Sequence, residues 1–127
     1  MIQVQTLLKV ADNSGGKVVR CLKILKKGTK PRYGKIGDVI VVSVQKIRSK
    51  NKLTSKVKKG DVLYAVIVKT KSVSNRKIGL CYSFNENAVV LLTKQLKPLA
   101  SRVLGLVPRE LRNEKFSKII ALASGII

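Results

Sequence analysis

The side chains of this chain that could do chemistry are overwhelmingly cations. Lys and Arg number 27 against six Asp and Glu, which gives a formal net charge of +21 over 127 residues. They are densest in residues 46–59, where seven cations and no acid fall within 14 residues. So many like charges repel one another unless a polyanion neutralises them, which indicates a nucleic-acid partner. A loop that only keeps the protein soluble is the alternative for this stretch, but mixed charges would serve solubility, so we interpret it as an arm that contacts a polyanion.

Residues suited to catalysis or metal binding are scarce. The chain has no histidine, so no side chain titrates near neutral pH and the usual Ser or Cys triads are excluded. Asp12, Asp38 and Asp61 lie in Gly-containing turn sequences, where an aspartate normally hydrogen-bonds its own turn backbone. Without a Cys-x-x-Cys pair, and with isolated acids, zinc and iron–sulfur sites lack ligands. We therefore expect no enzymatic activity, no metal and no cofactor.

The cysteines and the apolar segments bear on the compartment. Cys21 and Cys81 each lie in an apolar run, which predicts small buried side chains in a reducing compartment, with a disulfide as the less favoured alternative. The longest apolar stretch, residues 119–127, is interrupted by Ser124 and Gly125 and is shorter than the roughly 20 residues that span a bilayer, so no membrane insertion is expected. The first five residues look like neither a secretory signal nor an import presequence, so the product is expected to stay where it is made or to have been processed.

Runs of β-branched residues separated by Gly, Asp and Asn predict short strands. The predicted strands are residues 2–10, 17–25, 39–47, 62–71, 80–84 and 88–92. Their close succession favours a mainly β fold with little α, in the form of a small barrel. Residues 62–68 are almost continuously apolar, which implies burial on both faces, as in a barrel covered by helices.

The carboxy-terminal part predicts helical structure. Residues 108–112 indicate a short helical turn with proline at its first position. The apolar face of a following helix is given by residues spaced i, i+3, i+4 and i+7, namely Phe116, Ile119, Ile120 and Ala123. Asn113 would cap this helix, Gly125 would end it, and its apolar face should pack on the barrel. We expect one domain, residues 1–127, with the barrel at about 1–95 and a loop and helical tail at about 96–127.

Several sequence blocks occur in an order and at a spacing that resemble one known family. They are Ala-Asp-Asn-Ser-Gly-Gly-Lys at residues 11–17 with Cys21 after it, Tyr33, Ile-Gly-Asp at 36–38, Lys-Lys-Gly-Asp-Val at 58–62, Asn-Ala-Val-Val-Leu-Leu at 87–92 and Arg-Glu-Leu-Arg at 109–112. On these motifs the chain resembles the universal L-fourteen family of large-subunit ribosomal proteins, and the resemblance extends over essentially the whole chain.

The resemblance implies both a fold and a function. The fold would be a closed five-stranded β-barrel with a protruding β-ribbon and a short helical carboxy-terminal segment. The protein would bind large-subunit rRNA on the face toward the small subunit, contribute to a bridge with small-subunit rRNA, contact neighbouring ribosomal proteins and offer a docking surface to a ribosome-silencing factor. Binding would rest on phosphate neutralisation and on shape, because A-form RNA hides its base edges in a deep, narrow groove. The rival interpretations are a free single-strand-binding barrel, which needs several aromatic platforms, and an RNA-modifying enzyme, which needs a cofactor loop or an acid–base pair.

Two sets of residues are candidates for these contacts. The side chains expected to bind rRNA are Lys9, Asn13, Ser14, Lys17, Lys26, Lys27, Lys30, Arg32, Lys46, Arg48, Lys50, Lys52, Lys56, Lys58, Lys59, Lys69, Lys71, Arg76 and Lys77. The side chains expected at a protein or subunit interface are Ser101, Arg102, Arg109, Arg112, Lys115 and Lys118. Within the second set, Ser101, Arg102 and Lys118 align with the polar positions that family members present to the silencing factor.

The chain also departs from the family pattern. The family block Gly-Thr-Arg-Ile-x-Gly-Pro-Val is Ala-Ser-Arg-Val-Leu-Gly-Leu-Val at residues 100–107, so Arg102, Gly105 and Val107 match outright and Ser101 keeps the hydroxyl. Lysine richness, lost glycines and a longer loop at residues 49–55 suggest a fast-evolving, AT-rich genome. Together with the absence of a presequence, this favours a mitochondrion-encoded protein in the ribosome of the mitochondrial matrix, with the bacterial cytoplasm or the plastid stroma as alternatives.

Overall fold

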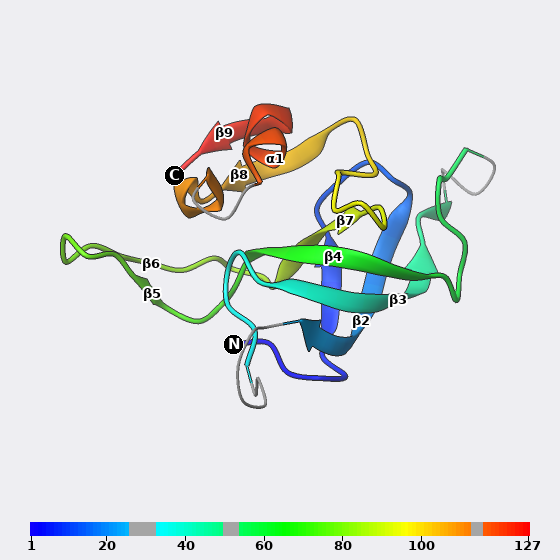
Figure 1. Ribbon diagram of the computed structural model, residues 1–127, viewed down its shortest axis with the longest axis horizontal. Coiled ribbons are helices and arrows are strands. Elements are labelled where there is room, and N and C mark those ends of the chain that lie inside the picture. Colours follow the sequence, from blue (N-terminus) through cyan, green and yellow to red (C-terminus); the bar gives the residue numbers. More distant parts are fainter. Residues whose placement is uncertain (26–32, 50–53, 113–115) are drawn as a thin grey trace.

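A closed five-stranded barrel forms the centre of the protein (Figure 1). The computed structural model describes residues 1–25, 33–49, 54–112 and 116–127. The barrel strands are β1 (Leu7–Val10), β2 (Gly16–Leu25), β3 (Val39–Ile47), β4 (Val62–Lys69) and β7 (Ala88–Leu92). Neighbouring strands are antiparallel, except that β1 and β7 pair in parallel and so close the barrel. The predicted mainly β class and the five-stranded barrel are confirmed.

The first strand is shorter than predicted. The extended segment expected at residues 2–10 is interrupted at Gln5, whose φ of 72° lies in the left-handed region that extended backbone does not use. Ile2 instead forms an isolated bridge with Gly34, and β1 begins only at Leu7. The predicted barrel strands at 17–25, 39–47, 62–71 and 88–92 agree with the observed ones to within two residues.

The barrel interior is filled by alternate side chains of its strands. The buried residues of this first core include Leu8, Val19, Ile40, Ile67 and Leu91, each at most 1% exposed. Alternation of this kind follows from the two-residue period of a β-strand, which sends successive side chains to opposite faces. The interior is therefore a packed apolar core, and the cations of the strands lie outside it.

β4 and β7 are buried on both faces. Ala65 and Ile67 of β4 point into the barrel core, whereas Val66 and Val68 belong to a second apolar core on the outer side. This second core is completed by the carboxy-terminal segment, which contributes residues such as Ile119. The burial on two faces predicted for residues 62–68 is confirmed, since a segment packed over the barrel covers their outer side.

The carboxy-terminal segment contains more strand than the sequence indicates. It comprises β8 (Val103–Val107), a 3-10 helix η2 (Arg109–Arg112), α1 (Ser117–Leu122) and β9 (Ala123–Ile126), with β8 and β9 paired in parallel. The short helical turn is confirmed. The predicted helix is wrong at its end: Ala123 has extended dihedrals of −78° and 152°, so α1 stops at Leu122 and Gly125 lies in β9. Phe116 occupies the N-cap position without a side-chain bond, and Asn113 lies outside the described residues.

A two-stranded ribbon projects from the barrel at the left of Figure 1. It consists of β5 (Ser74–Asn75) and β6 (Cys81–Tyr82), so the strand expected at residues 80–84 is reduced to two residues. This placement corrects the prediction for one cysteine: Cys81 is exposed on the ribbon, whereas Cys21 is buried in the barrel. Both cysteines are free thiols.

The basic stretch at residues 46–59 is held to the barrel. Its described parts are residues 46–49 and 54–59, and Val57 is 1% exposed within the barrel core. Burial of a valine side chain contributes about 1.5 to 3 kcal/mol to folding. The Lys56 amide also donates to the Ser14 carbonyl at 2.9 Å. Residues 54–59 therefore return to the core, and contact of the stretch with a polyanion stays a prediction.

Candidate nucleic-acid interface

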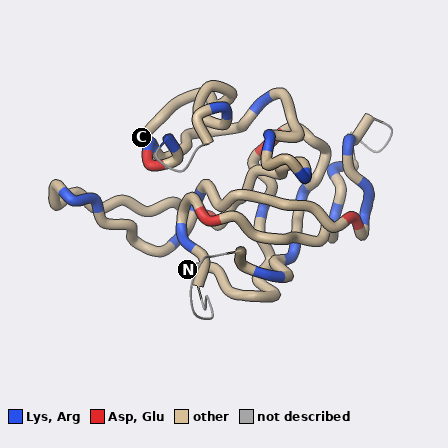
Figure 2. Tube along the Cα trace, in the orientation of Figure 1, with Lys and Arg blue, Asp and Glu red and all other residues tan. Residues whose placement is uncertain are grey.

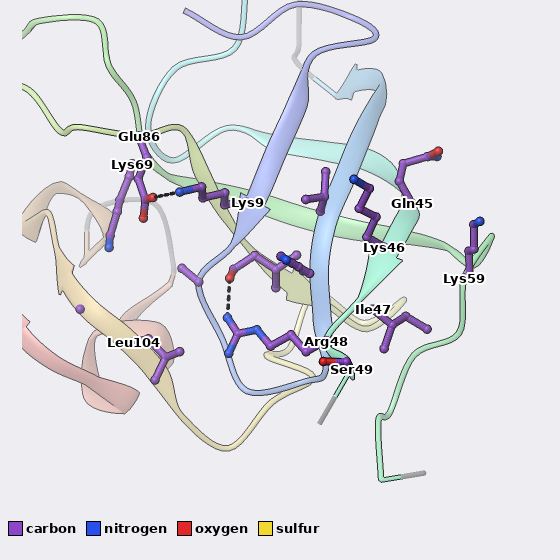
Figure 3. Close-up of a pocket in the computed structure, with 15 residues that line it drawn as sticks. Lys9, Gln45, Lys46, Ile47, Arg48, Ser49, Lys59, Lys69, Glu86 and Leu104 are labelled. Carbon is purple, nitrogen blue, oxygen red and sulfur yellow. Dashed lines mark hydrogen bonds and ion pairs between the residues drawn. The ribbon is translucent and has the colours of Figure 1, made fainter. Parts of the chain in front are cut away.

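Cations cover the barrel, the ribbon and the carboxy-terminal segment, with few acids between them (Figure 2). One groove of about 970 Å³ collects them on the outer side of β1, β2 and β3 (Figure 3). The cations that line this groove, hereafter the barrel groove, are Lys9, Lys17, Lys46, Arg48, Lys59 and Lys69. Among the residues that the structure describes, Glu86 is the single acid that lines it. The sequence named all six of these cations as candidates, and the structure brings them together.

The one acid in the barrel groove is already paired. Glu86 Oε2 accepts a hydrogen bond from Lys9 Nζ at 2.8 Å, and both side chains remain substantially exposed. The hydrogen bond from Lys9 outweighs partial burial and lowers the pKa of Glu86 below its ordinary value. The pair cancels its own charge, so the remaining five cations set a positive potential along the groove.

Two groove cations lie against neighbouring strands. Arg48 Nη2 donates to the Val10 carbonyl at 3.3 Å, which draws the guanidinium toward β1. Lys69 lies beside Gly105 of β8, where a Cβ would stand 2.7 Å from Lys69 Nζ and φ is +80°. A side chain at position 105 would therefore meet both backbone strain and the ammonium group, and glycine avoids both.

The turn after β1 is held by a buried carboxylate. Asp12 Oδ1 accepts from the Ser14 amide at 3.0 Å and from the Ser14 hydroxyl, and Asp12 Oδ2 accepts from the Leu91 amide at 3.0 Å. Asp38 and Asp61 likewise accept from the backbone amides of their own turns, so the predicted role of all three aspartates is confirmed. Ser14 is 1% exposed and its hydroxyl donates to Asp12, so its side chain stabilises the turn, and its predicted contact with rRNA stays a prediction.

Asn13 joins the barrel to the carboxy-terminal segment. Its side-chain NH₂ donates to Ser101 Oγ at 3.1 Å, and its side-chain oxygen accepts from the Arg102 amide at 3.1 Å. The structure thus brings together one residue expected to bind rRNA and two expected at a protein interface. Both polar groups of the amide are used within the protein, so the role the structure gives Asn13 is to support the 101–102 turn.

Other candidates are spread over the surface. Lys56 Nζ donates to the Leu99 carbonyl at 3.2 Å. The exposed candidates outside the barrel groove are Lys56, Lys58, Lys71, Lys77, Ser101, Arg102, Arg109, Arg112 and Lys118. The candidates outside the described residues are Lys26, Lys27, Lys30, Arg32, Lys50, Lys52 and Lys115.

Arg76 is the candidate whose surroundings differ most from expectation. Its guanidinium bonds both carboxylate oxygens of Glu110 and donates through Nη2 to the Ile127 carbonyl at 2.7 Å. Tyr82 donates from its hydroxyl to Glu110 at 3.1 Å, and its ring centroid lies 4.6 Å from the Arg76 guanidinium carbon. Glu110 and Tyr82 were absent from the predicted site. The sequence Arg-Glu-Leu-Arg at residues 109–112 shows that a charged side chain is present there, but it does not show that Glu110 binds Arg76 and Tyr82 of the ribbon.

The described residues offer little to any other class of site. Among them, no three His, Cys, Asp or Glu side chains gather where a metal ion could be held. No helix within these ranges has the length and apolar character needed to cross a membrane.

Fold and charge together define a basic β-barrel protein whose cations gather in a surface groove. Comparison with known proteins identifies the family. The family model described as ribosomal protein L14p/L23e matches residues 1–127. The large ribosomal subunit protein uL14 of Carsonella ruddii (strain PV) is 47% identical over 127 residues, which is 100% of both chains. The chain belongs to the ribosomal protein L14p/L23e family of large-subunit ribosomal proteins, which are structural proteins and not enzymes.

Proposed function

We propose that this chain binds large-subunit rRNA through the barrel groove, on the face of the subunit that meets the small subunit. The observation that carries the proposal is the convergence of Lys17, Lys46, Lys59, Lys69 and Arg48 on one groove in which the only acid is paired with Lys9. Each phosphate neutralised by such a cation releases condensed counterions, which provides the free energy of association.

The groove reads shape rather than sequence. Four of its cations, Lys9, Lys17, Lys46 and Lys69, are carried by strands of a closed barrel, so their spacing is fixed before RNA arrives. A rigid array of charges matches one path of phosphates and disfavours others, whereas base edges of A-form RNA stay out of reach. Aromatic stacking does not contribute in the barrel groove, because none of its lining residues is Phe or Tyr.

The proposal is tested by RNA binding of paired variants. Lys46→Ala/Lys59→Ala removes two exposed cations from the barrel groove, and Lys94→Ala/Lys97→Ala removes two exposed cations that line none of the hollows described here. Binding to a transcript of the large-subunit rRNA is measured as log K against log salt. The groove variant should lose about 1.4 to 1.8 from the slope, since each phosphate contact contributes roughly 0.7 to 0.9. Equal slopes for the two variants would refute the groove as the binding surface.

We further propose that Ser101, Arg102 and Lys118 form a docking surface at the subunit interface, for an intersubunit bridge and for a ribosome-silencing factor. All three are exposed, and pairing of Val103 with Ala123 joins the strand that follows Arg102 to the strand that follows α1. The alternative role for Arg102 and Lys118 is a further contact with RNA phosphates.

Reversing the charges of Arg102 and Lys118 distinguishes a docking surface from a contact with RNA phosphates. Arg102→Glu/Lys118→Glu should abolish capture of the silencing factor or joining of subunits while large subunits still assemble, because a reversed charge penalises the specific partner. Capture at wild-type strength would end the docking proposal. Failure of the variant to enter the large subunit would assign both residues to RNA.

The compartment remains a proposal of the same kind. The mitochondrial matrix stays a prediction from composition, and the identity of 47% with a bacterial protein is compatible with the alternative, the bacterial cytoplasm. Mass spectrometry of ribosomes purified from isolated mitochondria and from whole cells of the source would distinguish the two.

A further inference from the structure

A second basic hollow lies between the ribbon and the carboxy-terminal segment. It has a volume of about 980 Å³ and is lined by residues of the ribbon, of η2 and of the turn before β3. Among the described residues, the cations that line it are Lys35, Arg76, Lys77, Arg109 and Arg112, and the one acid is Glu110. We call it the ribbon hollow. No residue lines both the ribbon hollow and the barrel groove.

The acid of the ribbon hollow is fully engaged. Glu110 receives hydrogen bonds from Arg76 and from the Tyr82 hydroxyl. Partial burial acts to raise the pKa of Glu110, but these hydrogen bonds and one from its own backbone outweigh it, so the pKa is lowered and the carboxylate stays ionised. Its charge is balanced by Arg76, which leaves four exposed cations around the hollow, Lys35, Lys77, Arg109 and Arg112.

The same contacts set the orientation of the ribbon. β5 and β6 share only two residue pairs, and an isolated two-stranded hairpin of this size is marginally stable in water. Arg76 leaves the ribbon to meet Glu110 of η2 and the carbonyl of Ile127, while Tyr82 closes over its guanidinium. Tyr82 in turn packs edge to face with Phe84 at a centroid distance of 5.9 Å. The ribbon, η2 and Ile127 therefore meet at the Arg76 guanidinium.

We propose that the ribbon hollow is a second phosphate-binding site for rRNA, and that Arg76, Glu110 and Tyr82 are positioning residues that hold its two walls apart at a fixed distance. The proposal rests on the proposed function and extends it to a separate surface. Arg109 and Arg112, expected at a protein interface, here contact RNA together with Lys77.

The lining favours RNA phosphates over an acidic protein. Ser72, Ser74 and Asn75 line the hollow beside the cations, and hydroxyl and amide groups are usual donors to phosphate oxygens. One face of the Tyr82 ring is covered by Arg76 and the ring packs edge to face with Phe84, so little of it is open to a stacking base. The ribbon hollow is therefore better suited to bind the phosphate backbone of RNA than a base.

The cation test uses Arg109→Ala/Arg112→Ala beside the two variants already described. All three remove two charges, so they differ only in place. Arg109→Ala/Arg112→Ala should lose about 1.4 to 1.8 from the slope of log K against log salt, whereas Lys94→Ala/Lys97→Ala should lose much less. If only Lys46→Ala/Lys59→Ala changes the slope, the ribbon hollow is refuted and the barrel groove stands. If neither changes it, the proposed function itself fails. If Arg109→Ala/Arg112→Ala binds RNA normally but no longer captures another ribosomal protein, the hollow is a protein interface.

The test of the positioning role depends on whether a variant binds RNA more tightly or more weakly than the wild type. Glu110→Gln removes a negative charge from a basic hollow, so electrostatics alone predicts tighter RNA binding. Loss of the fixed geometry predicts binding several-fold weaker than wild type, in spite of the added positive charge. Tyr82→Phe changes no charge and removes one hydrogen bond to Glu110, so it should give a smaller loss in the same direction. A urea midpoint near that of the wild type confirms that each variant remains folded. Tighter binding of Glu110→Gln, or unchanged binding of both variants, would overturn the positioning role.

Discussion

Replacement of Asp12 by Asn tests how the turn after β1 is held to the barrel. The Asp12 side chain is fully buried, and its carboxylate accepts two hydrogen bonds from Ser14 and one from the Leu91 amide of β7. An asparagine has the same shape but carries an NH₂ group in place of one oxygen. Whichever way this group turns, it faces a buried amide that is itself a donor.

The cost follows from those three bonds. Either orientation gives up one backbone amide bond, to Leu91 or to Ser14, because the Ser14 hydroxyl can donate to an oxygen or accept from the NH₂ group. A hydrogen bond to a charged group contributes about 1.5 to 3 kcal/mol and a buried donor without a partner costs about 1 to 3 kcal/mol, so we expect the free energy of unfolding to fall by about 2 to 4 kcal/mol. With a urea dependence of about 2 kcal/mol/M, the midpoint should fall by about 1 to 2 M.

Urea unfolding followed by circular dichroism gives the midpoint and its slope. Asp61→Asn is the matched control, because it makes the same change in charge at an exposed turn where the carboxylate accepts one bond from the Lys58 amide. The control should lose less than about 1 kcal/mol, since water replaces the lost partner. Equal midpoints for Asp12→Asn and Asp61→Asn would refute the argument that the buried carboxylate holds the turn to β7.

Three further predictions concern thiols, pH and glycine. One thiol per chain should react with a maleimide in the native protein and two in denaturant. The reason is that Cys81 is exposed, whereas Cys21 is buried and its burial raises the pKa of the thiol. Rapid reaction of both thiols in the native protein would contradict the structure. The pKa of Glu110 is lowered in the folded protein, so the carboxylate stabilises the fold fully above its ordinary pKa of 4.5. This stabilisation is lost as the pH falls through the lower pKa of the folded state. Over this pH window the urea midpoint of the wild type should therefore drop more than that of Glu110→Gln. Gly15→Ala places a Cβ 2.4 Å from the Ser55 Cβ, whereas Gly60→Ala meets open space at a similar φ. The free energy of unfolding, measured by thermal unfolding, should therefore fall by about 1 to 3 kcal/mol more for Gly15→Ala than for Gly60→Ala. Equal melting temperatures of the two variants would exclude the close approach.

The strands could be read from the sequence because their signal is local. Alternation and β-branched residues marked β2, β3, β4 and β7 closely, and the continuous apolar run of β4 revealed its two buried faces. The end of α1 was missed because the apolar spacing of Phe116, Ile119 and Ile120 extends to Ala123, although the backbone there is already extended and pairs with β8. A parallel pair between distant segments has no local signature.

The candidate site was predictable in charge but not in pairing. The excess of positive charge is visible in the composition of the whole chain, so the cations of the barrel groove could be named as candidates from the sequence. Which of them are engaged within the protein depends on long-range contacts such as Lys9 with Glu86 and Arg76 with Glu110. The burial of Ser14 beside Asp12 is a fact of the same kind. Spacing along the chain carries no information on these partners.

The parallel pairing of β1 with β7 has a consequence for how the protein reaches its native state. Because Val10 pairs with Val89, the sheet closes only after nearly the whole barrel sequence is available, and a contact so distant along the chain forms slowly. Until then β1 and β7 are open edges that could pair with other chains. Repulsion between chains that each carry a charge of +21 opposes such self-association. The same lysines and arginines therefore act as a safeguard against aggregation during folding.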